Sequence, residues 1–322
     1  MADELMQGKI ASLWARVRDL PNLSLGEIDD LHFDCEMLYA RLLYASLKGS
    51  EHRRRLFAEA YCALTKVLTE RRRRFGRRMD SMGFNADSVE RILPFINPGA
   101  RILDVGCSTG VLVEALGKQG FHAEGVDIAG DLVAAGNDRL RAAGIGAEGQ
   151  PRLHCSDFLE LYEQIESYDL IHSNDVLEHI HPDECAEFLQ KCRRLLKPGG
   201  ILWLITPNRL TGPGDATALR HRIGTQSRGL HLKEYTLREL VRLLREQGFS
   251  RVQSQMWGKG RFRPWPSGYA ASYVRLKALL EPAFRLVPGE LRRRVMGILC
   301  YAEVLAFKAS VGVRSEQPEC GE

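Results

Sequence analysis

A short glycine-containing loop is the first place in the sequence where residue type and spacing could support chemistry. Gly106 and Gly110 follow the apolar run Arg101–Val105, which ends in the sequence Asp104-Val105. Glycine has no Cβ, so the backbone can turn tightly there and approach a ligand closely. The interval between the two glycines differs from the Gly-x-Gly-x-x-Gly pattern of nicotinamide-binding proteins. The loop therefore predicts a small-molecule site of another kind.

Polar residues stand at the ends of the next three apolar runs. Asp127, Asp157 and the pair Asn174-Asp175 each follow one run. The carboxyl ends of parallel strands meet at one edge of a sheet, where ligands bind. Asp127 could accept hydrogen bonds from both hydroxyls of a ribose, and Asp157 could accept one from an adenine amine. Any one of these aspartates could instead be a helix cap or a turn residue, but their shared register favours a nucleoside-type ligand.

Acidic and imidazole side chains cluster just after the fourth run. Asp175, Glu178 and His179 lie within five residues, and His231 stands far downstream, just before a predicted helix. A neutral imidazole can act as a general base near pH 7. Alternatively, Glu178 and His179 pack at a helix start and His231 orders a loop.

The elements that must position these residues alternate between strands and helices. Such alternation predicts an α/β fold with a mostly parallel sheet covered by helices on both faces. The predicted strands are 101–105, 121–128, 152–155, 168–173, 200–206, 249–256 and a last one from 303; the predicted helices are 111–118, 131–143, 158–165, 183–196 and 237–247.

Residues 1–85 predict a separate N-terminal helical module. Apolar residues recur at helical spacing in three segments, which are separated by Pro21-Asn22 and Gly49-Ser50. The third segment ends in six arginines within residues 71–78. This cluster could bind phosphate, or its cations could simply complement the dipole at a helix end.

Residues 86–310 predict the α/β domain, with an insertion at 258–300 before the last strand. We expect helices at 269–286 and 291–300, where apolar residues are interleaved with arginine and lysine. A basic amphipathic helix can lie on a membrane surface, or it can pack on the core as a lid. Residues 311–322 are polar, and we expect them to be disordered.

The composition argues against a zinc ribbon, a disulfide scaffold, a secreted protein and a membrane-spanning protein. Of 322 residues, 44% are hydrophobic and 27% are charged, which is ordinary for a globular protein. The eight cysteines form no Cys-x-x-Cys pair, which fits a reducing compartment. We find neither a secretory signal nor 18 consecutive apolar residues, and we expect a cytoplasmic protein. The net charge of +4 permits contact with phosphate or anionic lipid but does not require it.

Across residues 90–257 and the last strand, the chain resembles the class I S-adenosylmethionine-dependent methyltransferases. The resemblance is carried by Asp104-x-Gly106-x-x-x-Gly110, Val126-Asp127, Ser156-Asp157, Leu177–Ile180 and Leu196–Gly200, in family order and spacing. It implies a Rossmann-like fold with a seven-stranded sheet. Ser108 departs from the pattern, because a third glycine is commoner there. The implied cofactor-binding residues are Asp104, Gly106, Cys107, Ser108, Gly110, Asp127, Ile128, Asp157, Phe158 and Asn174.

The acidic and imidazole residues resemble those of ubiquinone-pathway O-methyltransferases and small-RNA terminal 2′-O-methyltransferases. In both groups a Glu-x-x-Glu-His segment and a later histidine bind a divalent cation. The resemblance implies that Asp175, Glu178, His179 and His231 hold Mg²⁺ or another divalent cation, with Asp175 in place of the first glutamate. Such a set offers carboxylate and imidazole ligands and leaves positions open for acceptor oxygens. The candidate catalytic residues are Glu178, His179 and His231.

The function so implied is O-methylation of a hydroxylated small molecule or a lipid-linked glycan. One alternative is an RNA 2′-O-methyltransferase, which the arginine cluster favours and the small charge excess disfavours. Another is a non-catalytic cofactor-binding scaffold. We expect a small-molecule or glycan acceptor as partner rather than nucleic acid. Peripheral contact of 269–300 with the inner face of the membrane and a homodimer are further expectations.

Overall fold

The computed structural model describes residues 2–75, 89–90, 93–146, 152–162, 164–222, 224–255, 269–284, 286–288 and 301–310. Several predictions lie outside these residues: the domain boundary near 85, the helix at 291–300, much of the insertion at 258–300, and the tail at 311–322. Arg77 and Arg78 of the arginine cluster lie outside them too.

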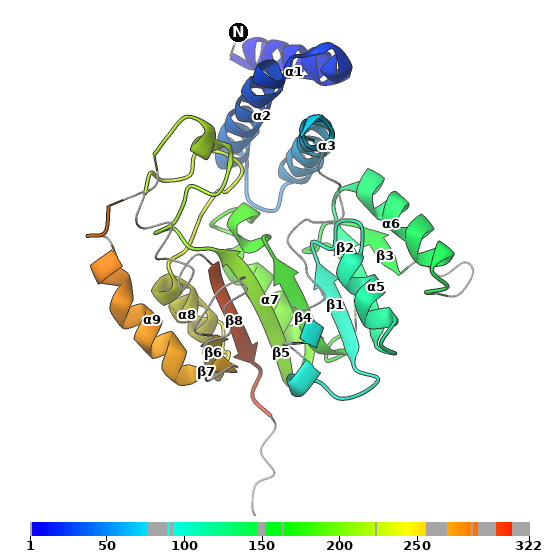
Figure 1. Ribbon diagram of the computed structural model, residues 1–322, viewed down its shortest axis with the longest axis vertical. Helices are drawn as coiled ribbons and strands as arrows, with labels where there is room; N and C mark the ends of the chain where they lie inside the picture. The colour runs from blue at the N-terminus through cyan, green and yellow to red at the C-terminus, as the bar shows by residue number, and fades with distance from the viewer. Residues whose placement is uncertain are drawn as a thin grey trace, which may run out of the picture.

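One sheet organises the α/β domain (Figure 1). Its strand order is β3-β2-β1-β4-β5-β8-β6-β7. Strands β1 to β5 pair in parallel, whereas β8 runs antiparallel to both β5 and β6. The two-residue strand β7 adds an eighth strand at the edge, beyond the predicted seven. The strands are β1 Arg101–Val105, β2 His122–Asp127, β3 Leu153–Cys155, β4 Tyr168–Asn174, β5 Leu196–Pro207, β6 Arg251–Gln255, β7 Tyr269–Ala270 and β8 Tyr301–Phe307.

Helices bury both faces of this sheet. Side chains alternate between the faces along a strand, and in β5 Leu202 and Leu204 join one apolar core while Ile201 and Trp203 join the other. The first core includes residues of α7 and α8, and the second includes residues of α5 and α6. The helices are α5 Val111–Gly117, α6 Gly130–Ala142, α7 Cys185–Leu195, α8 Leu237–Glu246 and α9 Ala271–Phe284, with short 3-10 helices at Leu20–Asn22, Leu93–Phe95, Leu177–His179 and Ala216–Leu219.

One predicted helix is wrong. Residues Phe158–Glu160 form a turn, and the described residues from there to 167 are not helical. The Asp157 carboxylate accepts a hydrogen bond from the Leu159 amide at 2.9 Å. A side chain that binds its own backbone two residues on favours a turn over a helix.

Three helices form the N-terminal part of the chain, as predicted: α1 Ala2–Arg18, α2 Leu25–Ala45 and α3 Glu51–Arg74. Ser24 begins α2 with a capping box, and the Ser50 side chain caps α3. The helices share an apolar core that also takes in Leu230 and Leu232 from the α/β domain. In Figure 1 they lie above the carboxyl edge of the parallel strands.

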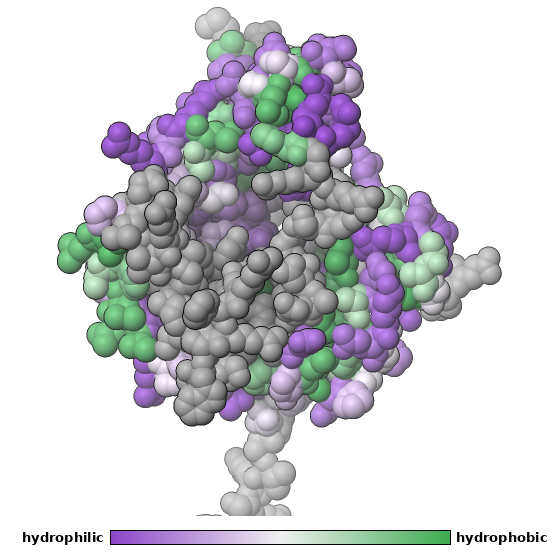
Figure 2. Space-filling model, in the orientation of Figure 1, coloured by the Kyte–Doolittle hydropathy of each residue, from purple (hydrophilic) through white to green (hydrophobic). Residues whose placement is uncertain are grey.

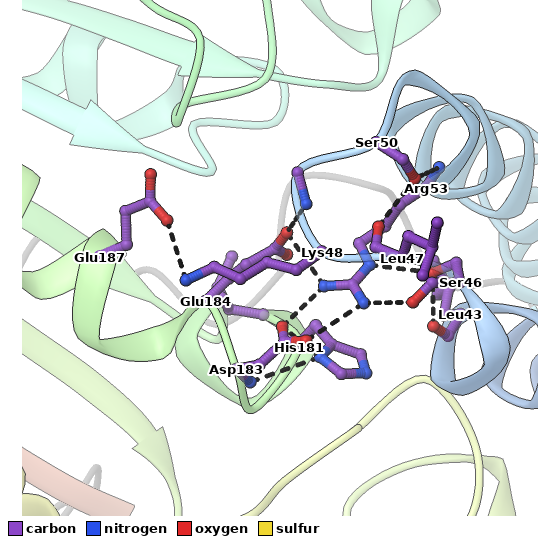
Figure 3. A network of polar contacts seen from close by, with 12 residues as sticks. Leu43, Ser46, Leu47, Lys48, Ser50, Arg53, His181, Asp183, Glu184 and Glu187 are labelled. Atoms are coloured by element: carbon purple, nitrogen blue, oxygen red, sulfur yellow. Dashed lines mark hydrogen bonds and ion pairs between the residues drawn. The ribbon is translucent and has the colours of Figure 1, made fainter.

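A buried arginine fixes this helical layer to the α/β domain (Figure 3). The Arg53 side chain is 2% exposed, and its Nη1 lies 2.7 Å from Asp183 Oδ1 and 3.0 Å from Glu184 Oε1. Its Nε and Nη2 donate to the side chain and the carbonyl of Ser46. Because Asp183 and Glu184 directly precede α7, this contact sets where α3 lies over the sheet edge.

None of the helices in the described part of the chain combines the length and the apolarity that crossing a bilayer requires.

Candidate active site

The loop after β1 adopts the tight turn that its glycines predict. Gly106 has a φ of 77°, and a Cβ there would lie 2.3 Å from Val176 Cγ2. Ser108 also has a positive φ, of 50°. A left-handed backbone strains residues that have a Cβ, which explains why a glycine is commoner at this position. Gly110 is the N-cap residue of α5, and a Cβ there would lie 2.7 Å from Leu153 Cδ1. The loop can therefore pack closely on Leu153 only with a glycine at this position.

Asp127, at the end of β2, holds this loop in place. One carboxylate oxygen accepts from the Ser108 amide and the other from the Ala129 amide, each at 2.8 Å. Burial raises the pKa of Asp127, although these backbone hydrogen bonds oppose the rise. The side chain lines the main cavity together with Ile128, and so it stands where the ribose prediction requires it.

Asp104 lies beneath the loop in a buried pair that the sequence did not predict. Its Oδ1 is 2.7 Å from Nδ1 of His172, whose ring packs edge-on against Trp203. Cys107 is buried beside them, and burial raises the pKa of its thiol well above the usual range. Asp104, Cys107 and His172 line a small cavity of about 110 Å³ at the predicted methionine end of the site.

A larger cavity of about 670 Å³ opens from the same loop. Gly106, Ser108 and Asn174 are walls of both cavities. Asp157 and Phe158 line the far side of the larger one, and Phe158 packs edge-on against Phe188 of α7. The volume lies within the range of ligand sites. Of the ten predicted cofactor residues, all but Gly110 therefore line one cavity or the other.

The roof of both cavities is one face of α3. Phe57, Tyr61 and Leu64 cover the larger cavity, and Thr69 and Arg72 cover the smaller one. This spacing places them along one side of a helix. Burial, with the nearby charges of Glu178, Asp127 and Glu36, raises the pKa of Tyr61 well above its usual range. The helical layer is thus part of the site, which the sequence left undecided.

His179 and His231 line the other end of the larger cavity, and the fully buried Glu178 lies next to them. Each offers one donor atom, and these atoms lie within 4.8 Å of one another. His179 Nδ1 lies 2.9 Å from the Leu230 carbonyl, and His231 Nδ1 lies 2.8 Å from Glu234 Oε1. In both contacts Nδ1 carries a proton and donates a hydrogen bond. In the neutral ring, the Nε2 atom of each histidine is then left with a lone pair for a metal ion or a proton.

The charges of this cluster are strongly coupled. Burial lowers the pKa of His179 to about 3, and the charge of His231 lowers it further. Burial also disfavours a charged His231, but the hydrogen bond to Glu234 and the nearby carboxylates outweigh it and raise its pKa to about 9. Burial raises the pKa of Glu178 to about 8, against the charge of His231. His179 is therefore neutral and His231 protonated near pH 7.

Asp175 does not join this cluster. It lines the same cavity with a backbone φ of 55°, and its Oδ2 accepts from the Asn174 side chain at 3.0 Å. The group whose donor atoms converge contains only the other three predicted metal ligands.

Residues of α2 and of the loop before α8 complete this end. Glu36 Oε1 lies 2.9 Å from His32 Nε2, and its Oε2 accepts from the amides of Ala216 and Leu230. Gly214, Asp215, Ala216 and Leu219 bring the loop into the cavity wall. Glu36 was not predicted as a site residue from the sequence. His32 and Glu36 are four residues apart in α2 and both are buried, so this polar pair within an otherwise apolar helix was the signal that could have identified it.

The described arginines of the 71–78 cluster and two arginines of the loop before α8 are mostly engaged within the protein. Arg71 pairs with Asp29, and Arg73 and Arg74 pair with Glu70. In the loop before α8, Arg209 and Arg220 pair with Glu239 and Asp30. Arg72 lies in the cavity roof. The described part of the cluster therefore supports packing more than phosphate binding.

The sheet order and the loop after β1 define the class I methyltransferase fold. A family model described as "Methyltransferase domain" matches residues 71–254. The chain therefore belongs to this family of S-adenosylmethionine-dependent methyltransferases.

Relatives in the family are similar over part of the chain. One is the ubiquinone biosynthesis O-methyltransferase of Xylella fastidiosa (strain 9a5c), 41% identical over 123 residues, which are 38% of this chain and 47% of that protein. The protein of the same name from Xanthomonas campestris pv. campestris (strain B100) is 39% identical over 112 residues, 35% of this chain and 45% of its own. The chain thus spans about half the length of these relatives.

Among solved structures, phosphoethanolamine N-methyltransferase 2 of Haemonchus contortus superposes with a TM-score of 0.51. It is 17% identical, and the match covers 80% of this chain and 60% of that one. At this identity the likeness shows the fold alone.

Proposed function

We propose that the protein transfers a methyl group from S-adenosylmethionine to a hydroxyl of a small-molecule acceptor. The observation that carries this proposal is that His179 and His231, which form a cluster with the buried Glu178, line the same cavity as Ser108 and Asp127. Cofactor and acceptor sites within one cavity are what a direct transfer requires. The names of the relatives support oxygen as the receiving atom.

The chemistry places modest demands on the protein. The sulfonium of the cofactor is a good leaving group, so the site must mainly align an acceptor oxygen in line with the methyl carbon. It must also take up the hydroxyl proton. The protein supplies a roof from α3 that excludes water and a neutral His179 whose Nε2 faces the cluster.

The cluster fits a divalent cation. Its two Nε2 atoms and one carboxylate converge, and the Nδ1 contacts to Leu230 and Glu234 are typical of metal-binding histidines. Glu178 Oε1 is buried without a hydrogen bond in the structure, while Oε2 accepts from Thr206. Two imidazoles with a carboxylate suit Mn²⁺ or Zn²⁺ as well as Mg²⁺. A bound cation would lower the pKa of the acceptor hydroxyl and orient it.

A transfer assay tests the proposal. Purified protein would be incubated with methyl-labelled S-adenosylmethionine and a fractionated cell lysate, with a chelator and after return of Mg²⁺ or Mn²⁺. We expect label in a small-molecule or lipid fraction, its loss with chelator and its recovery with the cation. Label in RNA or in no fraction would contradict the proposed acceptor, and label unaffected by chelator would contradict the cation alone.

A matched pair of variants separates the cluster from general damage. Glu178→Gln keeps the size of a side chain within the cluster but removes its ability to ionise and to bind a cation as a carboxylate. Glu187→Gln makes the same change on the exposed face of α7, where Glu187 pairs with Lys48. We expect Glu178→Gln to lose most of the transfer and Glu187→Gln to keep it. Equal activities of the two variants would remove Glu178 from the mechanism.

A further inference from the structure

A groove between α1 and α2 is separate from the proposed active site. Its volume is about 600 Å³, within the range of sites for small ligands. Among the described residues, none lines both this groove and either of the two cavities beneath α3. On α2 the two sites use opposite faces: His32 and Glu36 line the larger cavity, whereas Met37 and Arg41 line the groove. The proposed methyl transfer therefore does not account for the groove.

One face of each helix builds the groove. The residues that α1 and α2 contribute recur mostly at intervals of three and four, which places them on one side of their helix. They are Lys9, Ser12, Leu13 and Arg16 of α1, Asp34, Met37, Leu38, Ala40, Arg41 and Tyr44 of α2, and Arg228 of the loop before α8.

The floor of the groove is apolar. Leu13 and Ala40 are 4% and 1% exposed, and they belong to the core of the helical layer. Met37 and Leu38 are partly exposed beside them, and the Tyr44 side chain is exposed. A hydrocarbon group that covers such a floor releases water from both surfaces, which favours binding.

Positive charge dominates the exposed residues of the groove. Four cations and one carboxylate line it, although the whole chain carries a net charge of only +4. Arg16 pairs with that carboxylate, Asp34, at 2.7 Å. Lys9, Arg41 and Arg228 are exposed, and none of their side chains has an ion pair or a hydrogen bond with a residue in the described part of the chain. These cations repel one another, and a bound anion would relieve that repulsion.

We propose that this groove binds a single anionic amphiphile, which is a phosphate or carboxylate carried on a hydrocarbon chain. Arg41 and Arg228 pair with the anionic head, as arginine does with both groups, and the chain lies over Leu13 and Leu38. A concave groove of this size encloses one molecule, whereas the surface of a bilayer meets side chains that protrude. A nucleic acid that made phosphate contacts alone would leave the apolar floor unused.

Calorimetric titration with alkyl phosphates tests the site. Octyl phosphate, kept below the concentration at which it forms micelles, should bind with one molecule per chain. It should bind at least about tenfold more tightly than butyl phosphate, because the longer chain covers more of the apolar floor. Octyltrimethylammonium has the same chain with a positive head, and it should not bind.

Two double variants that remove the same charge locate the site. Arg41→Gln with Arg228→Gln removes two cations of the groove, and we expect octyl phosphate to bind about tenfold more weakly. Arg55→Gln with Arg242→Gln removes two exposed arginines outside the groove and should bind like the wild type.

Equal binding of octyl phosphate by the two double variants would overturn the groove as its site. Equal affinities of the wild type for inorganic phosphate and octyl phosphate would show a plain anion site and overturn the amphiphile. Binding to phosphatidylglycerol vesicles alone, or to RNA alone, would overturn the single-molecule occupant. None of these titrations depends on methyl transfer, so the failure of this proposal and the failure of the proposed function are distinguishable.

Discussion

At the scale of single residues, the chemistry of the proposed acceptor site depends on which ring nitrogen of His179 and of His231 carries the proton. The Leu230 carbonyl and the Glu234 carboxylate each hold an Nδ1 proton, so both Nε2 atoms turn toward Glu178. A histidine with a free Nε2 can be a base or a metal ligand. The pKa of His231 is the highest of the three groups in the cluster. Loss of the proton that makes His231 cationic therefore determines how the cluster responds to pH.

Cation affinity should therefore rise with pH. The pKa of His231 is raised to about 9, so at pH 7 a cation must displace a proton from it. Raising the pH from 7 toward 9 removes that competition and should increase the apparent affinity for Mn²⁺ by up to about tenfold per pH unit. A titration of Mn²⁺ at several pH values measures this. An affinity that is flat over this range would contradict the assignment of His231 as a ligand.

The same raised pKa values affect stability. His231 and Glu178 bind protons more tightly in the folded protein than their ordinary values allow. This tighter proton binding adds to the free energy of unfolding. The added stability is fully present below the unfolded pKa of each group and is lost as the pH rises through about 8 for Glu178 and about 9 for His231.

Residues that follow strands could be predicted from their position, and His231 could be predicted from the family resemblance, whereas several other residues of the site could not be predicted. Asp127 and the Gly106–Gly110 loop lie where predicted, because strand ends and glycines leave local signals. His172, Tyr61 and Glu234 reach the site by packing between distant segments. Asp175 lines the same cavity, but its carboxylate is not in the group whose donor atoms converge, and spacing alone does not reveal which way a strand-end side chain turns.

At the scale of elements, the position of α3 controls the geometry of the site. Its Arg53 end is fixed on Asp183 and Glu184, and its middle covers the cavity. Helical periodicity predicted the helix itself. Its docking partner could not be predicted, because an arginine buried against two acidic residues looks like any other charged residue in a sequence.

Replacing Arg53 with alanine should destabilise the protein. The change leaves Glu184, which is 7% exposed, without its ion pair, so we expect unfolding to cost about 3 kcal/mol less. Denaturant unfolding measures this loss. Arg55→Ala is the control, since Arg55 is exposed and pairs with Glu51 on the same helix; it should change stability by less than about 0.5 kcal/mol. Similar values for the two variants would show that Arg53 does not dock the helix.

The wrong helix prediction at 158–165 has a local cause. The segment is amphipathic, but the Asp157 side chain binds the Leu159 amide and sets a turn. A carboxylate before an apolar run reads equally as a helix cap, so the pattern did not separate the two outcomes.

At the scale of the whole molecule, the exposed face of α9 is the largest feature that methyl transfer does not explain. Val274, Lys277 and Glu281 face inward, whereas Leu276 and Leu279 are 41% and 72% exposed. Figure 2 shows a hydrophobic area over this helix at the left edge of the molecule. We propose that this apolar face, together with the exposed Arg275, lies on a membrane surface.

Co-sedimentation with anionic phospholipid vesicles tests the membrane contact. The double variant Leu276→Glu and Leu279→Glu should lose most of the bound fraction, because it places two charges on the apolar face. Tyr162→Glu is the control, since Tyr162 is 96% exposed and is not part of α9. Equal sedimentation of both variants would show that α9 makes no such contact.

The mostly parallel sheet with helices on both faces was the most predictable feature at this scale, because alternating strands and helices leave few arrangements. The helical layer over the site was not predictable, since its apolar core borrows Leu230 and Leu232 from a distant loop.

Cofactor binding tests the central claim most directly. Calorimetric titration with S-adenosylhomocysteine should show one site per chain in the wild type. Asp127→Asn should weaken binding at least about tenfold, because a charged acceptor of hydrogen bonds is lost. Asp138→Asn, on the exposed side of α6 beside Arg141, should bind like the wild type. No binding by the wild type, or equal binding by Asp127→Asn, would contradict the assignment of the cavity beneath α3 as the methyl-donor site.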